Sequence, residues 1–164
     1  MNELASFWWK SSPQLIAALL GTTGFALVFK MKRTHLFWVS VGGLLTYGIY
    51  ITMIFKGQTE FLSAFFAASF VALLSEILSR IEKAPTVIFL TTVLISIVPG
   101  SGLYYSMRNL LLRDIASFSK YFKSTCAVSA GMVFGIIFIS AMIKLLTVFI
   151  RKNNDFIHEK EKTQ

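Results

Sequence analysis

The sequence has few of the residues from which disulfides and metal centres are built. Its 164 residues include one cysteine, Cys126, and two histidines, His35 and His158, which are far apart in the chain. A single cysteine excludes an intrachain disulfide, and these three residues do not have the spacing of a metal site. We therefore predict that no metal is bound, and we expect Cys126 to be a small packing residue of an apolar helix.

Charged residues are also scarce, at 15%, whereas hydrophobic residues make up 55% and the mean hydropathy is +0.66. This is more apolar than a water-soluble domain of this size needs for one core. Several runs approach the roughly 20 apolar residues that cross a ~30 Å hydrocarbon layer as a helix. The composition predicts an all-α integral membrane protein in contact with the lipid bilayer.

Acidic residues are half as numerous as basic ones, 8 against 16, which gives a net charge of +8. The lysines and arginines do not line one helical face, as in many nucleic-acid-binding proteins, but form short clusters between apolar runs. Such clusters are typical of the cytoplasmic segments of membrane proteins. We therefore exclude nucleic acid as a partner, and the distribution favours an outside N-terminus and an inside C-terminus.

We predict a single transmembrane domain over residues 1–164, with about five membrane helices within 13–152. The expected spans are 14–29, 36–55, 61–81, 86–112 and 125–150. An aromatic N-terminal segment, 1–12, is expected at the membrane interface, and Pro13 suits the first turn of the first helix. A polar basic tail, 153–164, is expected to be frayed.

Small residues recur at helical spacing in two of the expected spans. Ala64, Ala68 and Ala72 share one face of the third span, and Gly131 and Gly135 share a face of the last one. Small residues let a neighbouring backbone approach closely. These faces are suited to a partner subunit or to homo-oligomerisation.

The fourth expected span contains Val98-Pro99-Gly100, and we predict that the helix breaks there and resumes at Ser101. Proline removes a helical hydrogen bond and disfavours helical geometry at the residue before it. In lipid, a broken helix is tolerated only inside protein or beside a water-filled cavity. The alternative is a helix that ends at the membrane surface and is followed by an interfacial segment.

The break is the strongest candidate binding site in the sequence. Free backbone N–H groups near Ser101, Gly102 and Leu103 would lie at a helix N-terminus, which favours an anion such as a carboxylate. Discontinuous helices form substrate sites in secondary transporters. The candidate substrate-binding residues are Pro99, Gly100, Ser101, Gly102, Tyr104 and Tyr105, and Arg108 is a further candidate.

A second candidate is the pair Glu76 and Arg80, which lie four residues apart on one face of the third span. An intramembrane carboxylate can relay protons or bind a coupling ion; the alternative is a simple ion pair near the cytoplasmic end. Lys144 is expected to extend to the interface. The sequence contains no nucleophile-plus-base arrangement and no P-loop lysine spacing, so we predict no enzymatic activity and no catalytic residue.

Three segments resemble the small (YjjB-like) subunits of the split threonine/serine exporter family. They are GFALVFK at 24–30, SRIEKAP at 79–85 and VPGSGLY at 98–104, and their order and spacing match over nearly the whole chain. The chain departs from the family pattern at Ser96 and in the segment 30–33, where the family usually has prolines.

The resemblance implies a multi-pass protein of the bacterial inner membrane that works with a larger, separately encoded subunit. It implies export of threonine, serine or a small dicarboxylate such as succinate, coupled to protons, with no metal or organic cofactor. The residues alone leave open a non-transporting membrane scaffold. An intramembrane enzyme is the weakest alternative, because Glu76 has no evident catalytic partner.

Overall fold

The structure, a computed structural model, describes residues 2–162, with side chains described for 12–33 and 35–149. It is built from helices only in this part of the chain. They are α1 (Asn2–Val28), α2 (Arg33–Phe55), α3 (Glu60–Glu82), α4 (Thr86–Leu94), the 3₁₀ turn η1 (Ile95–Ile97), α5 (Gly100–Leu111) and α6 (Ile115–Lys162). The prediction of an all-α chain is confirmed.

Three helices of the described region are long and apolar enough to cross a membrane: α2, α3 and α6 over Ile115–Phe149. The pair α4–η1 and α5 makes a fourth when it is taken as one span bent by 54°. The apolar part of α1, Ser12–Val28, is shorter. The protein therefore has roughly four to five spans, and the prediction of about five with the fourth broken is confirmed.

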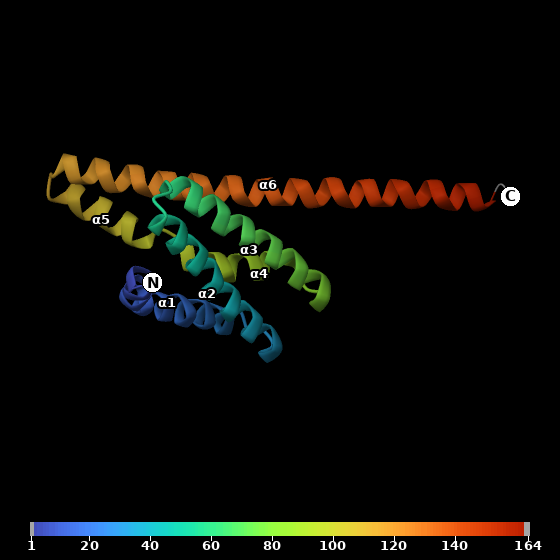
Figure 1. Ribbon diagram of the computed structural model, residues 1–164, viewed down its shortest axis with the longest axis horizontal. Helices are drawn as coiled ribbons and strands as arrows, with labels where there is room; N and C mark the ends of the chain where they lie inside the picture. The colour runs from blue at the N-terminus through green and yellow to red at the C-terminus, as the bar shows by residue number, and fades with distance from the viewer. Residues whose placement is uncertain (1, 163–164) are drawn as a thin grey trace.

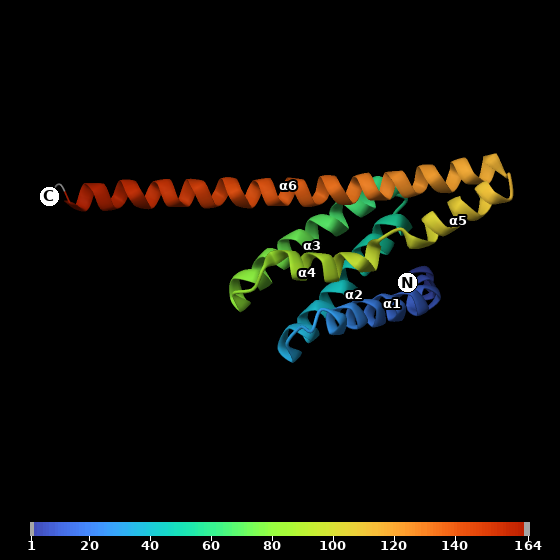
Figure 2. The ribbon, with the colours of Figure 1, turned by 180° about the vertical axis from the view of Figure 1, so that it is seen from behind.

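The helices run back and forth along one direction (Figure 1). The α1–α2 and α3–α4 turns lie at one end of the bundle, and the α2–α3 turn lies at the other. Beyond that second end, α5 and the first turns of α6 form a projecting hairpin. The view from behind shows that α6 then returns along α3 and extends past the α3–α4 turn (Figure 2).

Two helix boundaries differ from the prediction. Pro13 does not occupy the first turn of a helix, because α1 begins at Asn2 and contains this proline in its interior. Membrane helices accept an internal proline when nearby groups satisfy the freed carbonyl. Helix α6 starts at Ile115 rather than near 125 and continues as helix to Lys162. Its 48 residues are ~72 Å long at 1.5 Å per residue, more than twice the hydrocarbon thickness.

Large hydrophobic side chains are exposed on all the long helices. In water, exposed apolar surface on this scale would drive association. In a bilayer the same side chains face lipid at no cost. Examples are Leu20 on α1, Phe37 on α2, Leu73 on α3 and Phe138 on α6.

The centre of the bundle is the close contact between α3 and α6. A Cβ atom at Gly131 would collide with the backbone carbonyl oxygen of Phe61, and one at Gly135 with that of Phe65. Ala64, Ala68 and their neighbour Ala67 are fully buried at this contact. The two small-residue faces predicted from the sequence therefore pack against each other within one chain, and they no longer argue for a partner subunit or for homo-oligomerisation.

A second apolar cluster joins the first four helices. It contains Ala26, Val39, Val71, Leu78, Phe89 and Val93. Between α1 and α2 the hydroxyl oxygens of Thr23 and Ser40 lie 2.8 Å apart and share a hydrogen bond.

Basic residues end three of the helices in the left-handed backbone region: Lys30 after α1, Lys83 after α3 and Arg113 after α5. Asp114 follows Arg113 in the α5–α6 turn, and its Oδ1 accepts the backbone N–H of Ser117 at 3.1 Å. Hydrogen bonds from the side chain and then the backbone of Ser117 lower the pKa of Asp114. The ionised carboxylate thus caps the start of α6.

The α3–α6 contact predicts that Gly131→Val destabilises the protein by about 1–3 kcal/mol or more, because the side chain must displace the Phe61 backbone. Gly24→Val is the matched control, since a Cβ at this helical position has nothing within 4 Å. Thermal unfolding in detergent micelles measures both. Equal changes in Tm for the two variants would show that the contact is not tight.

Candidate functional site

The predicted break is present between η1 and α5. The Gly100 N–H donates to Val98 O at 2.7 Å, and the Leu103 N–H donates to Pro99 O at 3.1 Å. Leu103 is therefore not one of the free donors expected from the sequence. The N–H groups of Ser101 and Gly102 remain without an acceptor among the described residues, as at other helix N-termini, and α5 has no side-chain cap.

A pocket of about 310 Å³ surrounds this end of α5. Four of the six predicted residues line it: Pro99, Ser101, Gly102 and Tyr105. Gly100 and Tyr104 are not among its lining residues, and Tyr104 is 64% exposed. The other lining residues come from α2, the end of η1 and α6, and they are Tyr47, Tyr50, Ser96, Ile97, Val98, Tyr121, Ser124, Thr125 and Val128.

Six of the eight hydroxyl-bearing residues that line this pocket, which we call the break pocket, divide into two sets. Those of Ser96, Ser124 and Thr125 already donate, to Val93 O, Glu60 Oε2 and Tyr121 O respectively, and so offer the pocket acceptor lone pairs. Ser101 and the stacked rings of Tyr105 and Tyr121, whose centroids are 5.3 Å apart, supply further hydroxyls near α5. No charged side chain is among the described residues that line the pocket.

Glu76 and Arg80 form the expected pair. Nε and Nη2 of Arg80 each lie 3.1 Å from Glu76 Oε1, and the Thr86 hydroxyl lies 3.4 Å from Oε2. The Glu76 side chain is 29% exposed and that of Arg80 is 60% exposed. The pair borders a second pocket of about 570 Å³, which we call the Glu76 pocket.

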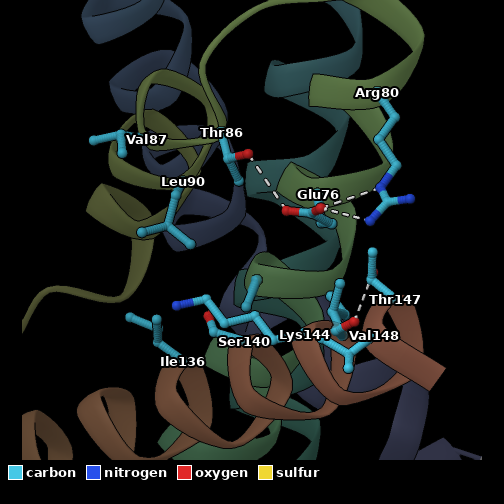
Figure 3. A pocket seen from close by; sticks show the side chains of 12 residues that line it. Glu76, Arg80, Thr86, Val87, Leu90, Ile136, Ser140, Lys144, Thr147 and Val148 are labelled. Atoms are coloured by element: carbon cyan, nitrogen blue, oxygen red, sulfur yellow. Dashed lines mark hydrogen bonds and ion pairs between the residues drawn. The ribbon is translucent and has the colours of Figure 1, made fainter. Parts of the chain in front are cut away.

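The walls of the Glu76 pocket are α3, α4 and α6. Figure 3 shows Glu76 facing Thr86 and Arg80, with Ser140, Lys144 and Thr147 on α6 across from them. The sequence predicts that Lys144 extends to the interface, separately from Glu76. The structure places it in the same pocket as Glu76.

Both pockets are lined by α6, and apolar side chains separate them. Ile97 and Val128 line the break pocket, Ile136 lines the Glu76 pocket, and all three belong to or touch one buried cluster. Met132, 7% exposed, is the α6 residue of that cluster between Val128 and Ile136. Arg108, the further candidate, lies in the last turn of α5, is exposed, and is not among the residues that line either pocket.

Other features were missed by sequence reasoning. His35 of α2 is buried, its Nδ1 lies 3.2 Å from Glu82 Oε1, and its ring meets that of Phe89 edge-on at 5.7 Å. The tyrosines that α2 and α6 contribute to the break pocket were also missed, because no local spacing links them to α5. Cys126 is exposed on α6 rather than packed inside, which corrects the expectation for this residue.

A family model described as "Threonine/Serine exporter, ThrE" matches residues 14–142, a range that includes both pockets except for the last Glu76-pocket residues of α6. The chain belongs to the threonine/serine exporter family. This is a family of membrane transporters rather than of enzymes, which agrees with the resemblance, the multi-pass helices and the predicted lack of enzymatic activity. No curated protein and no solved structure matched the chain significantly.

The two glycines at the break provide a test of its geometry. A Cβ at Gly102 would collide with Thr125 Oγ1 of α6, whereas a Cβ at Gly100 has nothing within 4 Å. We therefore expect Gly102→Ala to lower export severalfold, because α5 must move away from α6. Gly100→Ala should leave export near the unmodified level. Solute export at matched membrane levels of protein measures both, and the reverse order would contradict this geometry.

Proposed function

We propose that this exporter-family chain is the small subunit of a secondary transporter of the bacterial inner membrane. It exports small carboxylate-bearing solutes, threonine or serine or a dicarboxylate such as succinate, together with a larger subunit of the same family. The observation that carries the proposal is the uncharged, hydroxyl-lined pocket at the N-terminus of α5.

The donors of the break pocket suit a carboxylate. The N–H groups of Ser101 and Gly102 point out of the N-terminus of α5, where the helix dipole adds a partial positive charge. The hydroxyls of Ser101 and Tyr105 lie on the same helix. A carboxylate bound here supplies the hydrogen-bond acceptors that these N–H groups would otherwise lack in a membrane.

The acceptors of the pocket favour an amino acid over a dicarboxylate. Ser124 and Thr125 on α6 donate their protons elsewhere, so they present lone pairs to a bound solute. An ammonium or hydroxyl group of threonine or serine can donate to these oxygens. A second carboxylate beside Ser124 and Thr125 would meet acceptors there and would depend on the tyrosine hydroxyls of the pocket for donors.

Glu76 is the coupling carboxylate in this proposal. Arg80 and Thr86 hold its carboxylate in place, and its position on the wall of the Glu76 pocket gives it access to a proton. Ionisable groups within membrane helices are costly and are retained mainly for such roles.

The proposal is tested by the export of labelled threonine, serine and succinate from cells with and without the chain and its larger subunit. Ser101→Leu should lower the flux at least tenfold, because the new side chain fills the carboxylate position. Ser129→Leu, an exposed change on α6 outside the break pocket, is the control. Fluxes that do not depend on the chain for any of the three solutes would refute the proposed function.

The scaffold alternative predicts a different effect of the same variants on solute flux. If the chain only assembles a complex, Ser101→Leu should leave the flux unchanged while co-purification with the larger subunit persists. Loss of flux with co-purification retained favours the transporter.

Replacement of Glu76 tests coupling. In Glu76→Gln the carboxylate that takes up the proton is gone, so export should no longer increase with an imposed proton gradient, although solute still binds. Glu76→Asp keeps the ionisable group and should keep the dependence. Flux measured in proteoliposomes with and without a pH gradient distinguishes them; an unaltered gradient response in Glu76→Gln would exclude this carboxylate.

A further inference from the structure

The Glu76 pocket contains a cation that the proposed function does not use. Lys144 lies within the apolar stretch Ile115–Phe149 of α6 and lines the pocket. In the described part of the chain no acidic side chain pairs with it, since Glu76 is held by Arg80. An ammonium group within a span is costly unless it reaches the interface or meets an opposite charge.

A continuous row of α6 side chains connects this lysine with the break pocket. Tyr121, Thr125 and Val128 line the break pocket, Met132 follows, and Ile136, Ser140, Lys144 and Thr147 line the Glu76 pocket. Intervals of three and four residues make successive side chains neighbours, so they form a row that runs along the helix and turns around it by about 160° from Val128 to Lys144. The α3 helix packs against both α4 and α6, so it forms the floor between them.

Buried apolar side chains block the path along this row at its middle. Ile97 from η1 and Met132 from α6 are buried in the cluster that also contains Ala64, Ala67 and Ala68 of α3. A solute that leaves the break pocket along α6 must pass this cluster, and the Glu76 pocket lies on its other side, where Ile136 packs against the cluster. Polar groups line that space beside the apolar ones: Glu76, Arg80, Thr86, Ser140, Lys144 and Thr147.

We propose that Lys144 is the carboxylate-binding residue of a second solute subsite in the Glu76 pocket, separated from the break pocket by the Ile97–Met132 cluster. The proposal rests on the proposed function, because its ligand is the exported solute. The Lys144 ammonium binds the solute carboxylate, with the Ser140 hydroxyl one turn away on α6. Charge complementarity favours an anion, because Arg80 and Lys144 together exceed the single negative charge of Glu76.

The test restores the charge chemically. Lys144→Cys is made in a Cys126→Ser background, which removes the one native cysteine, and is assembled with the larger subunit in proteoliposomes. The half-saturating solute concentration should rise about tenfold, as expected for the loss of one charge-assisted hydrogen bond. Modification with 2-aminoethyl methanethiosulfonate puts an ammonium back and should reverse most of the rise. Methyl methanethiosulfonate, which adds no charge, should not reverse it.

Protection and a matched control complete the experiment. Saturating solute should slow modification of Lys144→Cys, but not of Met142→Cys, which is exposed on the opposite face of α6, about 200° around the helix, and is not a lining residue of the pocket. Unchanged half-saturation in Lys144→Cys, or equal recovery with the charged and uncharged reagents, would overturn the subsite while leaving the proposed function standing. Absence of export by the unmodified complex would instead overturn the proposed function and the subsite with it.

Discussion

The contact between α3 and α6 is the constraint on which the rest of the structure depends. Without side chains at Gly131 and Gly135, α6 lies directly on the backbone of α3 near Phe61 and Phe65. In a bilayer the hydrophobic effect does not drive helices together, so helix association relies on close van der Waals packing of this kind. The contact fixes which face of α6 lies toward η1 and α4, and therefore where both pockets form.

The features that could be predicted from the sequence are local in the chain. Proline and glycine at positions 99 and 100 act on their own backbone, so the break was evident, and the Glu76–Arg80 pair follows from one turn of helix. The small-residue faces were also evident, but periodicity does not say which helix a face meets. It could not show that they meet each other rather than another subunit.

Features that depend on tertiary packing escaped prediction. The different surroundings of Gly100 and Gly102 arise from the approach of Thr125, far along the chain. The approach of His35 Nδ1 to Glu82 Oε1 brings the start of α2 to the end of α3, and no sequence spacing encodes it. The early start of α6 was missed because the lysines at 120 and 123 resemble a charged loop, although lysine is a good helix former.

The length and continuity of α6 have a mechanical consequence. Tyr121 and Thr125 lie on one side of Gly131 and Gly135, and Lys144 and Thr147 lie on the other, all on one uninterrupted helix. A rigid rod that tilts about its tightest contact moves its two arms in opposite directions. Rocking of α6 on α3 would therefore displace the α6 residues of the break pocket and those of the Glu76 pocket in opposite directions, so that a change at one pocket is transmitted directly to the other.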